Sequence, residues 1–301
     1  MTKFLLDSGD PIEYKTIAAL ALSHGQELWG STTNPSLIAK KLAGQKVSMS
    51  DAFSKLQKEI VEQILTIVPG AVSAEAFSNL TTQASEMIQQ GLEIATWHPR
   101  IVVKLPTTIE GFKARFELRK KGITINNTLV FSQQQVFAIS LHEKLLKQEY
   151  GATSSGWPCF ISPFIGRLDD KGENGLTMLL HATQMVHDLF GNDLVWMLAA
   201  SIRSAMHLKA SVAYGCELIT APAKIYDEWF GLSSQEQASL SDQPATALQD
   251  IPLWHPSEQL LTIQSIDELM QAITSGVLDI SHPLTTAGIE KFVADWQQIL
   301  I

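Results

Sequence analysis

The chain has 301 residues, a formal net charge of −9 and a pI of about 5.4. Non-specific binding to nucleic acid needs a basic face, so this acidic balance argues against a nucleic-acid partner. A composition of 45% hydrophobic and 18% charged residues is typical of a globular protein of one large domain or two ordinary ones. An anionic small substrate stays compatible with it, because a few local arginines suffice to hold a phosphate.

The sequence predicts a protein without a membrane partner. No apolar stretch reaches the roughly 18 residues that cross a bilayer, and Asp7 interrupts the short apolar start, which argues against a signal peptide. Two cysteines in strand-like segments, Cys159 and Cys216, fit a reducing compartment, so we expect a cytoplasmic protein. The histidines lack metal-ligand spacing, and we expect no metal and no organic cofactor. The oligomeric state stays open, with a homodimer as one alternative.

Eight short apolar runs alternate with longer segments of helical period. The runs occupy residues 4–7, 28–33, 71–77, 101–105, 123–130, 159–165, 194–201 and 218–221. Their spacing, mostly about 20 to 35 residues, is the length of a strand–helix unit. Eight such units predict an α/β protein with a (β/α)8 TIM barrel. A doubly wound open sheet is the main rival, but no G-x-G-x-x-G follows a strand.

Two further segments matter for the outer layer of the barrel. Residues 111–121 set Phe112 and Phe116 against a basic cluster that includes Arg115 and Arg119, and we expect that face to be solvated. At the other end of the chain, a polar stretch precedes two predicted amphipathic helices.

Residues 233–250 are interpreted as a surface connection, and residues 256–273 and 285–300 as the two helices. We therefore expect residues 1–301 to form a single barrel domain, with 232–301 as a helical extension that packs on the barrel or covers its mouth.

Lys104 interrupts the apolar run 101–106 (IVVKLP), which is typical of a buried strand. Lysine is almost never fully buried without a partner or a purpose. Burial favours the neutral form of an amine, and a neutral amine can attack a carbonyl carbon to form a Schiff base. The alternative is an edge-strand lysine that extends its amine to water.

Each of the first seven runs has a polar residue near its end or just after it. In barrels of this kind the C-terminal ends of the strands carry the catalytic residues. The polar residues are Asp7, Asn34, Glu75, Lys104, Asn126, Thr128, Ser162, Arg167, Ser201 and Arg203. Asp7 could instead cap the helix that begins near Pro11, but Asp10 serves that purpose at least as well. Glu75, inside an apolar run, should point inward, as an ion-pair partner or as a group that moves protons.

Two of the five arginines follow apolar runs and could hold a phosphate. Arg167 and Arg203, together with Ser201 and a helix that we expect to open there, would form the clamp. The alternative is that each arginine pairs with a surface carboxylate, for example Arg167 with Asp169 or Asp170.

Four strings resemble the strand motifs of the transaldolases. Residues 31–38 (STTNPSLI), 122–132 (GITINNTLVFS), 161–167 (ISPFIGR) and 198–203 (LAASIR) are similar to the second-, fifth-, sixth- and seventh-strand motifs of that family. Residues 288–292 (GIEKF) are similar to a C-terminal helix of its members. The resemblance runs along essentially the whole chain in one order.

The resemblance implies a set of catalytic roles. Lys104 would form the Schiff base with C2 of a ketose phosphate, and Asp7 would take the proton of the C4 hydroxyl as the C3–C4 bond breaks. Glu75 and Thr128 would hold a water that carries protons. The implied reaction transfers a dihydroxyacetone unit from sedoheptulose 7-phosphate to glyceraldehyde 3-phosphate, in the pentose phosphate pathway.

The resemblance also implies substrate-binding roles and alternatives. The residues expected to contact the sugar phosphate are Asn34, Asn126, Ser162, Phe164, Arg167, Ser201 and Arg203. The related fructose-6-phosphate aldolases tend to carry glutamine at Glu75 and tyrosine at Phe164 and to lack the long C-terminal extension, so these features favour transfer over cleavage. Compared with the classical transaldolases, the stretch between Ser132 and Ser162 is longer and the segment 168–175 is shorter. Both lie around the expected mouth of the barrel, so a modified ketose phosphate stays an alternative substrate. A regulator that only binds sugar phosphates is a third.

Overall fold

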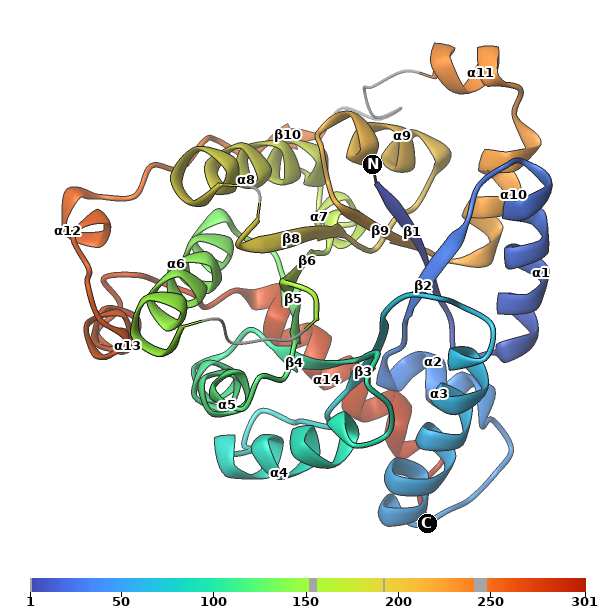
Figure 1. The fold of residues 1–301 in the computed structure, drawn as a ribbon, viewed down its shortest axis with the longest axis horizontal. Coiled ribbons are helices and arrows are strands. Elements are labelled where there is room, and N and C mark those ends of the chain that lie inside the picture. The colour runs from blue at the N-terminus through green and yellow to red at the C-terminus, as the bar shows by residue number, and fades with distance from the viewer. Residues whose placement is uncertain (1, 152–155, 192, 241–247) are drawn as a thin grey trace.

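The computed structural model describes residues 2–151, 156–191, 193–240 and 248–301. Within them, parallel strands close into a barrel in the order β1-β2-β3-β4-β5-β6-β8-β9 (Figure 1). The strands are β1 (Lys3–Asp7), β2 (Leu28–Thr32), β3 (Val72–Glu75), β4 (Ile101–Pro106), β5 (Ile125–Val130), β6 (Cys159–Pro163), β8 (Val195–Ala199) and β9 (Leu218–Ala221). Each lies within one predicted run or starts or ends within two residues of it, and the predicted (β/α)8 barrel is confirmed.

Helices between the strands form the outer ring of the barrel (Figure 1). They are α1 (Pro11–Ser23), α2 (Pro35–Lys41), the π-helical η1 (Asp51–Gln57), α3 (Lys58–Leu65), α4 (Ala84–Ala95), α5 (Ile109–Lys120), α6 (Gln133–Tyr150), α7 (Ile165–Asp169), α8 (Gly175–Phe190), α9 (Ala205–Ala213) and α10 (Ala223–Gly231). Several begin at short polar residues that follow a strand: Asp10, Thr108 and Ser132 each accept a hydrogen bond from an amide of the first turn. At these three positions the cap starts the helix that runs back along the outside of the barrel.

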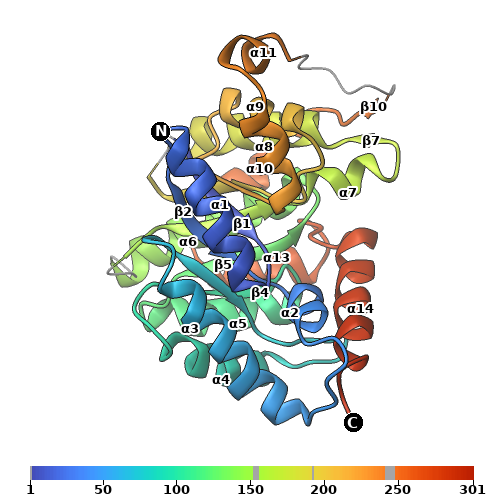
Figure 2. The same cartoon turned by 90° about the vertical axis from the view of Figure 1, so that its right-hand side faces the viewer.

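The C-terminal extension departs from its prediction in two respects: the expected surface connection over 233–250 contains a short helix and a short strand, and one predicted helix is divided. Its elements are α11 (Ser234–Ser239), β10 (Gln249–Asp250), which pairs with β7 (Glu173–Asn174), α12 (Glu258–Leu261), α13 (Ile266–Thr274) and α14 (Pro283–Gln297). The helix predicted over 256–273 is two helices, because Ser265 caps a new start by accepting from Glu268 N. Helix α14 packs beside α2 along one side of the barrel (Figure 2). Residues 241–247 of the polar connection, and 152–155 of the longer loop, lie outside the described residues.

The strand register assembles polar side chains at one level of the barrel wall. Glu75 on β3 pairs with Lys104 on β4, and Lys104 pairs with Asn126 on β5. Since alternate residues of a strand face the same side, Thr128 shares the inner side of β5 with Asn126. Apolar residues such as Val103 and Leu105 pack outward under the helices. The fold therefore directs its polar residues inward at the end of the strands where barrels carry chemistry.

The basic face of α5 is buried, and the prediction that it is solvated is wrong. Arg115 and Arg119 are 1% and 2% exposed, and Glu143 of α6 receives both, at 2.6 Å from Arg115 Nη2 and 2.9 Å from Arg119 Nη2. Arg115 Nε also donates to Asn127 Oδ1 at 3.0 Å. A single carboxylate on the neighbouring helix therefore compensates two guanidinium groups, whereas Lys113 on the same helix stays exposed.

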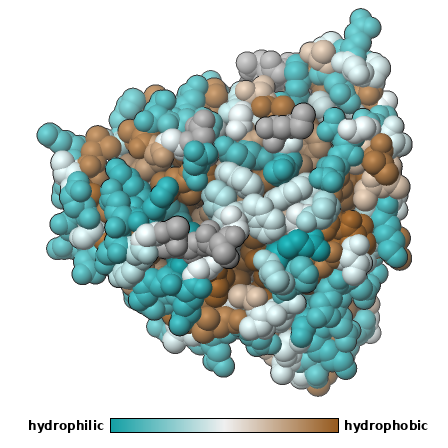
Figure 3. Space-filling view, in the orientation of Figure 1, coloured by the Kyte–Doolittle hydropathy of each residue, from teal (hydrophilic) through white to brown (hydrophobic). Residues whose placement is uncertain are grey.

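The remaining surface is mixed. The face seen in Figure 3 presents mainly hydrophilic residues, with hydrophobic ones in smaller groups between them. Over the part of the chain that the structure describes, no helix combines the length and hydropathy needed to cross a bilayer.

Candidate active site

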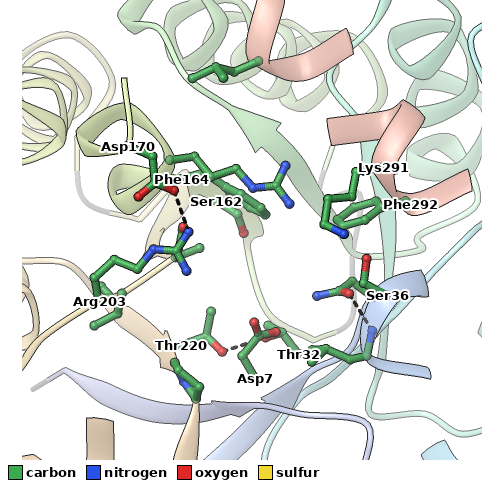
Figure 4. A pocket seen from close by; sticks show the side chains of 18 of the residues that line it. Asp7, Thr32, Ser36, Ser162, Phe164, Asp170, Arg203, Thr220, Lys291 and Phe292 are labelled. Carbon is green, nitrogen blue, oxygen red and sulfur yellow. Dashed lines mark hydrogen bonds and ion pairs between the residues drawn. The ribbon is translucent and has the colours of Figure 1, made fainter. Parts of the chain in front are cut away.

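A cavity of about 610 Å³ opens at the C-terminal ends of the strands (Figure 4). The predicted site residues that line it are Asp7, Asn34, Lys104, Ser162, Phe164, Arg167, Ser201 and Arg203. The other three, Glu75, Asn126 and Thr128, are buried in the barrel wall. Helix α14 covers one side of the cavity, where Lys291 and Phe292 face it. The structure thus brings the predicted residues of seven strands and their loops to one place.

Lys104 is 3% exposed and is held by two neighbours. Its Nζ donates to the carbonyl oxygen of Thr33 at 2.8 Å and lies 3.0 Å from Glu75 Oε2. Burial raises the pKa of the Glu75 carboxyl, although the Lys104 charge acts in the opposite direction. An amine with a fixed direction, beside a carboxyl that takes up protons more readily than usual, combines a nucleophile with a proton carrier.

Asp7 lies at the end of β1, and its carboxylate accepts a hydrogen bond from one hydroxyl group. Thr32 Oγ1 donates to Asp7 Oδ1 at 2.7 Å and lies 2.6 Å from Thr220 Oγ1. Burial raises the pKa of Asp7, partly offset by Lys104. The capping alternative does not apply, because Asp10 accepts from Ile12 N. Asp7 is therefore available to the cavity as a base.

Two buried oxygens in this part of the barrel wall have no hydrogen-bond partner among the described residues. They are Glu75 Oε2, which faces Lys104 at ion-pair distance without hydrogen-bond geometry, and Thr128 Oγ1. Buried polar atoms without partners are rare in folded proteins and are costly. Among the described residues, nitrogen atoms of His142, His181 and His187 also have no partner, so the two oxygens indicate a site for a polar ligand through the cavity next to the Lys104 wall.

Amide and hydroxyl groups next to Lys104 are fixed by one another. Ser162 Oγ donates to Asn126 Oδ1 at 2.6 Å, and Asn126 Nδ2 donates to Ser73 Oγ at 3.1 Å. On the opposite wall, Asn34 Oδ1 accepts from Leu37 N at 3.0 Å and caps α2. This capping bond uses the oxygen of Asn34 and leaves its amide group as a donor toward the cavity.

Arg167 lines the cavity, and its guanidinium group lies near two aromatic rings. Its guanidinium carbon lies 5.3 Å from the ring centre of Phe164 and 5.5 Å from that of Phe292 on α14. Burial, reinforced by the positive charge of Arg203, lowers the pKa of Arg167. Among the described residues no ion pair joins Arg167 to a carboxylate, so the surface-pair alternative does not hold for it.

Arg203 differs from Arg167, because it does pair with a carboxylate. Its Nη2 lies 3.0 Å from Asp170 Oδ2, and both side chains are about half exposed, so the pair is weak and exchangeable. The helix expected to open at Ser201 begins later, at Ala205, where Ser204 caps it. Ser201 instead has a left-handed backbone with φ 58°, which turns the chain beside the cavity. The anion-binding candidate therefore rests on the two arginines and Ser201, without the helix start.

Residues 4–301 match the Transaldolase/Fructose-6-phosphate aldolase family. The chain belongs to this family. Relatives named probable transaldolase share 33% identity in Desulfitobacterium hafniense, over 99% of both chains, and 31% in Syntrophomonas wolfei, over 98% of this chain and 99% of the relative. A third, from Herpetosiphon aurantiacus, is 32% identical over 99% of this chain and 96% of its own.

Three residues that line the cavity were not predicted from the sequence as site residues. Lys291, Ser36 and Asp170 line the cavity, and Asp295 links the first two, since Ser36 Oγ donates to its carboxylate and Lys291 Nζ lies 2.9 Å from Oδ2. Ser36 and Lys291 fall inside strings that resemble the family, 31–38 and 288–292, which is the signal that could have marked them. Their meeting depends on α14 lying against α2.

Proposed function

We propose that this chain is a transaldolase. It transfers a dihydroxyacetone unit from sedoheptulose 7-phosphate to glyceraldehyde 3-phosphate, yielding erythrose 4-phosphate and fructose 6-phosphate, as a cytoplasmic step of the pentose phosphate pathway. The observation that carries the proposal is the buried Lys104 amine, 3.0 Å from the Glu75 carboxyl, at the bottom of a cavity whose far side holds Arg167 and Arg203. Family membership supports the aldol chemistry, and the relatives' names support transfer.

The first half-reaction forms and breaks bonds at the buried end of the cavity. The Lys104 amine attacks the C2 carbonyl carbon, and loss of water gives the Schiff base. Asp7 takes the proton of the C4 hydroxyl, the C3–C4 bond breaks, and its electron pair moves to the iminium nitrogen as an enamine. Glyceraldehyde 3-phosphate or erythrose 4-phosphate leaves as the aldehyde. Asp7 suits this role because its raised pKa makes it a stronger base than a solvated carboxylate.

Proton transfer during formation of the Schiff base needs a carrier between amine and carbinol oxygen. Among the described residues, Glu75 Oε2 and Thr128 Oγ1 are buried oxygens without a hydrogen-bond partner. We assign to them a water molecule that gives and takes these protons.

The remaining residues hold the substrate in register. Asn34, Asn126 and Ser162 would bind the hydroxyls of the three-carbon unit, while Arg167, Ser201 and Arg203 would hold the phosphate. Helix α14 covers one side of the cavity and would help to keep water from the enamine until an aldose phosphate accepts the unit.

Two observations favour transfer over plain aldol cleavage. The side chain at position 164 is a phenylalanine, packed against Arg167 and Phe131, so it offers no hydroxyl to activate water. The second is the cover that α14 provides. Release of glyceraldehyde 3-phosphate from fructose 6-phosphate should therefore depend on erythrose 4-phosphate. Release that is equally fast without an acceptor would indicate a fructose-6-phosphate aldolase.

The lysine is tested by trapping. We expect borohydride with fructose 6-phosphate to leave a reduced three-carbon adduct on Lys104, mapped by peptide mass spectrometry. Lys291→Ala changes a cavity lysine that lies on α14 instead of β4; it is the matched control and should keep the adduct. An adduct that persists in Lys104→Ala would contradict the proposal. A panel of ketose phosphates, including sulfonated analogues, then identifies the preferred donor, and turnover with none of them would indicate a binding protein.

A further inference from the structure

Strand β5 bends at Leu129, directly after Thr128. Leu129 has φ 57°, a left-handed conformation that is uncommon for a leucine. The pairing of β5 with β6 shifts its register between Asn127 and Val130, so the bend is a bulge. Bulges beside active sites redirect side chains. The side chain immediately before this bulge is Thr128, one of the two buried oxygens without a partner.

A hydroxyl of the C-terminal extension holds the bend. Thr285 Oγ1, on α14, donates to the carbonyl oxygen of Leu129 at 2.8 Å. Gln135 Nε2 donates to the same Thr285 oxygen at 3.0 Å. Because this amide already donates to the oxygen, the Thr285 proton points toward Leu129. All three residues are buried, so bulk water does not replace the bond when it is lost.

Gln135 is itself fixed on every side. Its Oε1 accepts from Phe131 N at 2.7 Å and Ser132 N at 3.2 Å, which follow the bend. Its Nε2 also donates to Ile280 O at 2.9 Å, in the segment before α14. Leu129 is therefore bonded directly to the C-terminal extension, and Phe131 and Ser132 are linked to it through Gln135.

The side chain of Leu129 also lies directly under α14. A Cβ atom on Gly288 would come within 2.6 Å of Leu129 Cδ2 and 2.8 Å of Arg167 Nη1. The absence of a side chain at Gly288 lets the helix approach both residues. One face of α14 thus contacts the bend in β5 and the arginine on the far side of the cavity.

We propose that Thr285 is a positioning residue for proton transfer at Lys104. Its hydroxyl holds Leu129 in the left-handed conformation, and this bend aims Thr128 Oγ1 at the water that it shares with Glu75. The role rests on the proposed function and adds to it: the C-terminal helix sets the rate of Schiff-base formation in addition to covering the cavity.

The test compares substitutions that keep or remove the donor. Thr285→Val preserves shape and removes the hydroxyl, Thr285→Ser restores the hydroxyl, and Thr286→Val, at the exposed next position, is the matched control. Losing one buried hydrogen bond at the bend should reduce the rate of borohydride-trappable adduct formation with fructose 6-phosphate to about one tenth in Thr285→Val. We expect its KM to stay within about twofold, and the serine and control variants to react at nearly the wild-type rate.

Two results overturn the role of Thr285. One is Thr285→Val forming the adduct as fast as the wild type, and the other is Thr285→Ser being as slow as Thr285→Val. If the valine variant does not fold, Thr285→Cys and Thr285→Ala replace it. Because a thiol is a weaker hydrogen-bond donor than a hydroxyl, the rate of adduct formation in Thr285→Cys should lie between the rates of Thr285→Ser and Thr285→Ala. Any other order contradicts the inference. A wild-type chain that forms no adduct refutes the proposed function first, whereas a normal wild-type adduct with an unaffected Thr285→Val refutes only this inference.

Discussion

Two buried clusters of charged residues in this barrel differ in how completely they are paired. The helix cluster, Arg115, Arg119 and Glu143 between α5 and α6, pairs both guanidinium groups with one carboxylate. The lysine cluster, Asp7, Glu75 and Lys104 inside the barrel, lies beside a cavity and has a carboxylate oxygen without a hydrogen bond. Burial of charge alone therefore does not identify an active site; a cavity that opens onto the charged groups does.

The carboxyl groups of the two clusters respond to burial in opposite ways. Burial raises the pKa of Glu75 more than Lys104 lowers it, whereas Arg115 and Arg119 overcome the burial of Glu143 and lower its pKa. The lysine cluster thus carries a cost in stability that the helix cluster does not, as expected where the sequence serves chemistry.

The largest expected effect separates the clusters by activity. Lys104→Met should lower kcat by at least about 10⁴-fold, because it removes the nucleophile. The stability of this variant should change little, since Glu75 can take up a proton once its partner is lost. Steady-state kinetics with urea unfolding checks both. A Lys104→Met variant that turns over substrate as fast as the wild type would show that Lys104 does not take part in catalysis.

Breaking the helix cluster should show the reverse pattern. Glu143→Gln leaves two buried guanidinium groups without their compensating charge and should reduce the free energy of unfolding by ~3 kcal/mol. Its kcat, measured well below the unfolding temperature, should stay within about twofold. A Glu143→Gln enzyme of unchanged stability but reduced kcat would mean that this cluster acts on the site.

A fall in pH should change the contributions of Glu75 and Glu143 to folding stability in opposite directions. With a raised pKa, Glu75 binds protons more readily in the folded chain, so its contribution to stability falls as pH rises through the window between unfolded and folded pKa. With a lowered pKa, Glu143 contributes stability above its unfolded value, about 4.3, and loses it as pH falls through the folded value.

Urea unfolding of two variants from pH 8 to pH 4 checks these signs. Glu75→Gln should be more stable than the wild type at pH 8 and Glu143→Gln less stable. The first difference should shrink as the pH falls, whereas the second should stay nearly constant down to about pH 4.3, because the Glu143 contribution is lost only below its unfolded pKa. Differences of the same sign at pH 8 would contradict the contrast between the clusters.

The smallest effect concerns the exposed ion pair at the mouth of the cavity. Asp170→Asn releases Arg203 for the substrate, and because exposed pairs contribute up to about 1 kcal/mol, KM for fructose 6-phosphate should fall by no more than about fivefold. Added salt should reduce the difference. A higher KM would show that Asp170 supports the position of Arg203.

Much of the barrel could be predicted, because strand and helix patterns are local in the chain. The run around Lys104 predicted a buried strand, and Asp7 was correctly separated from the capping residue Asp10. The prediction for Arg115 and Arg119 was wrong because a basic helix face has the same pattern whether it meets water or a carboxylate on the next helix.

By itself the sequence determined the eight strand–helix units, the residues at the ends of the strands and the resemblance to a family. Only the tertiary structure decided which polar groups meet: Thr285 reaches Leu129 across 156 positions of the chain, and Ser36 reaches Asp295 across 259. No local pattern encodes such contacts, because they arise when the closed barrel fixes where α14 can pack. The residues at the ends of the strands could therefore be predicted from the sequence, and their contacts with the C-terminal helix could not.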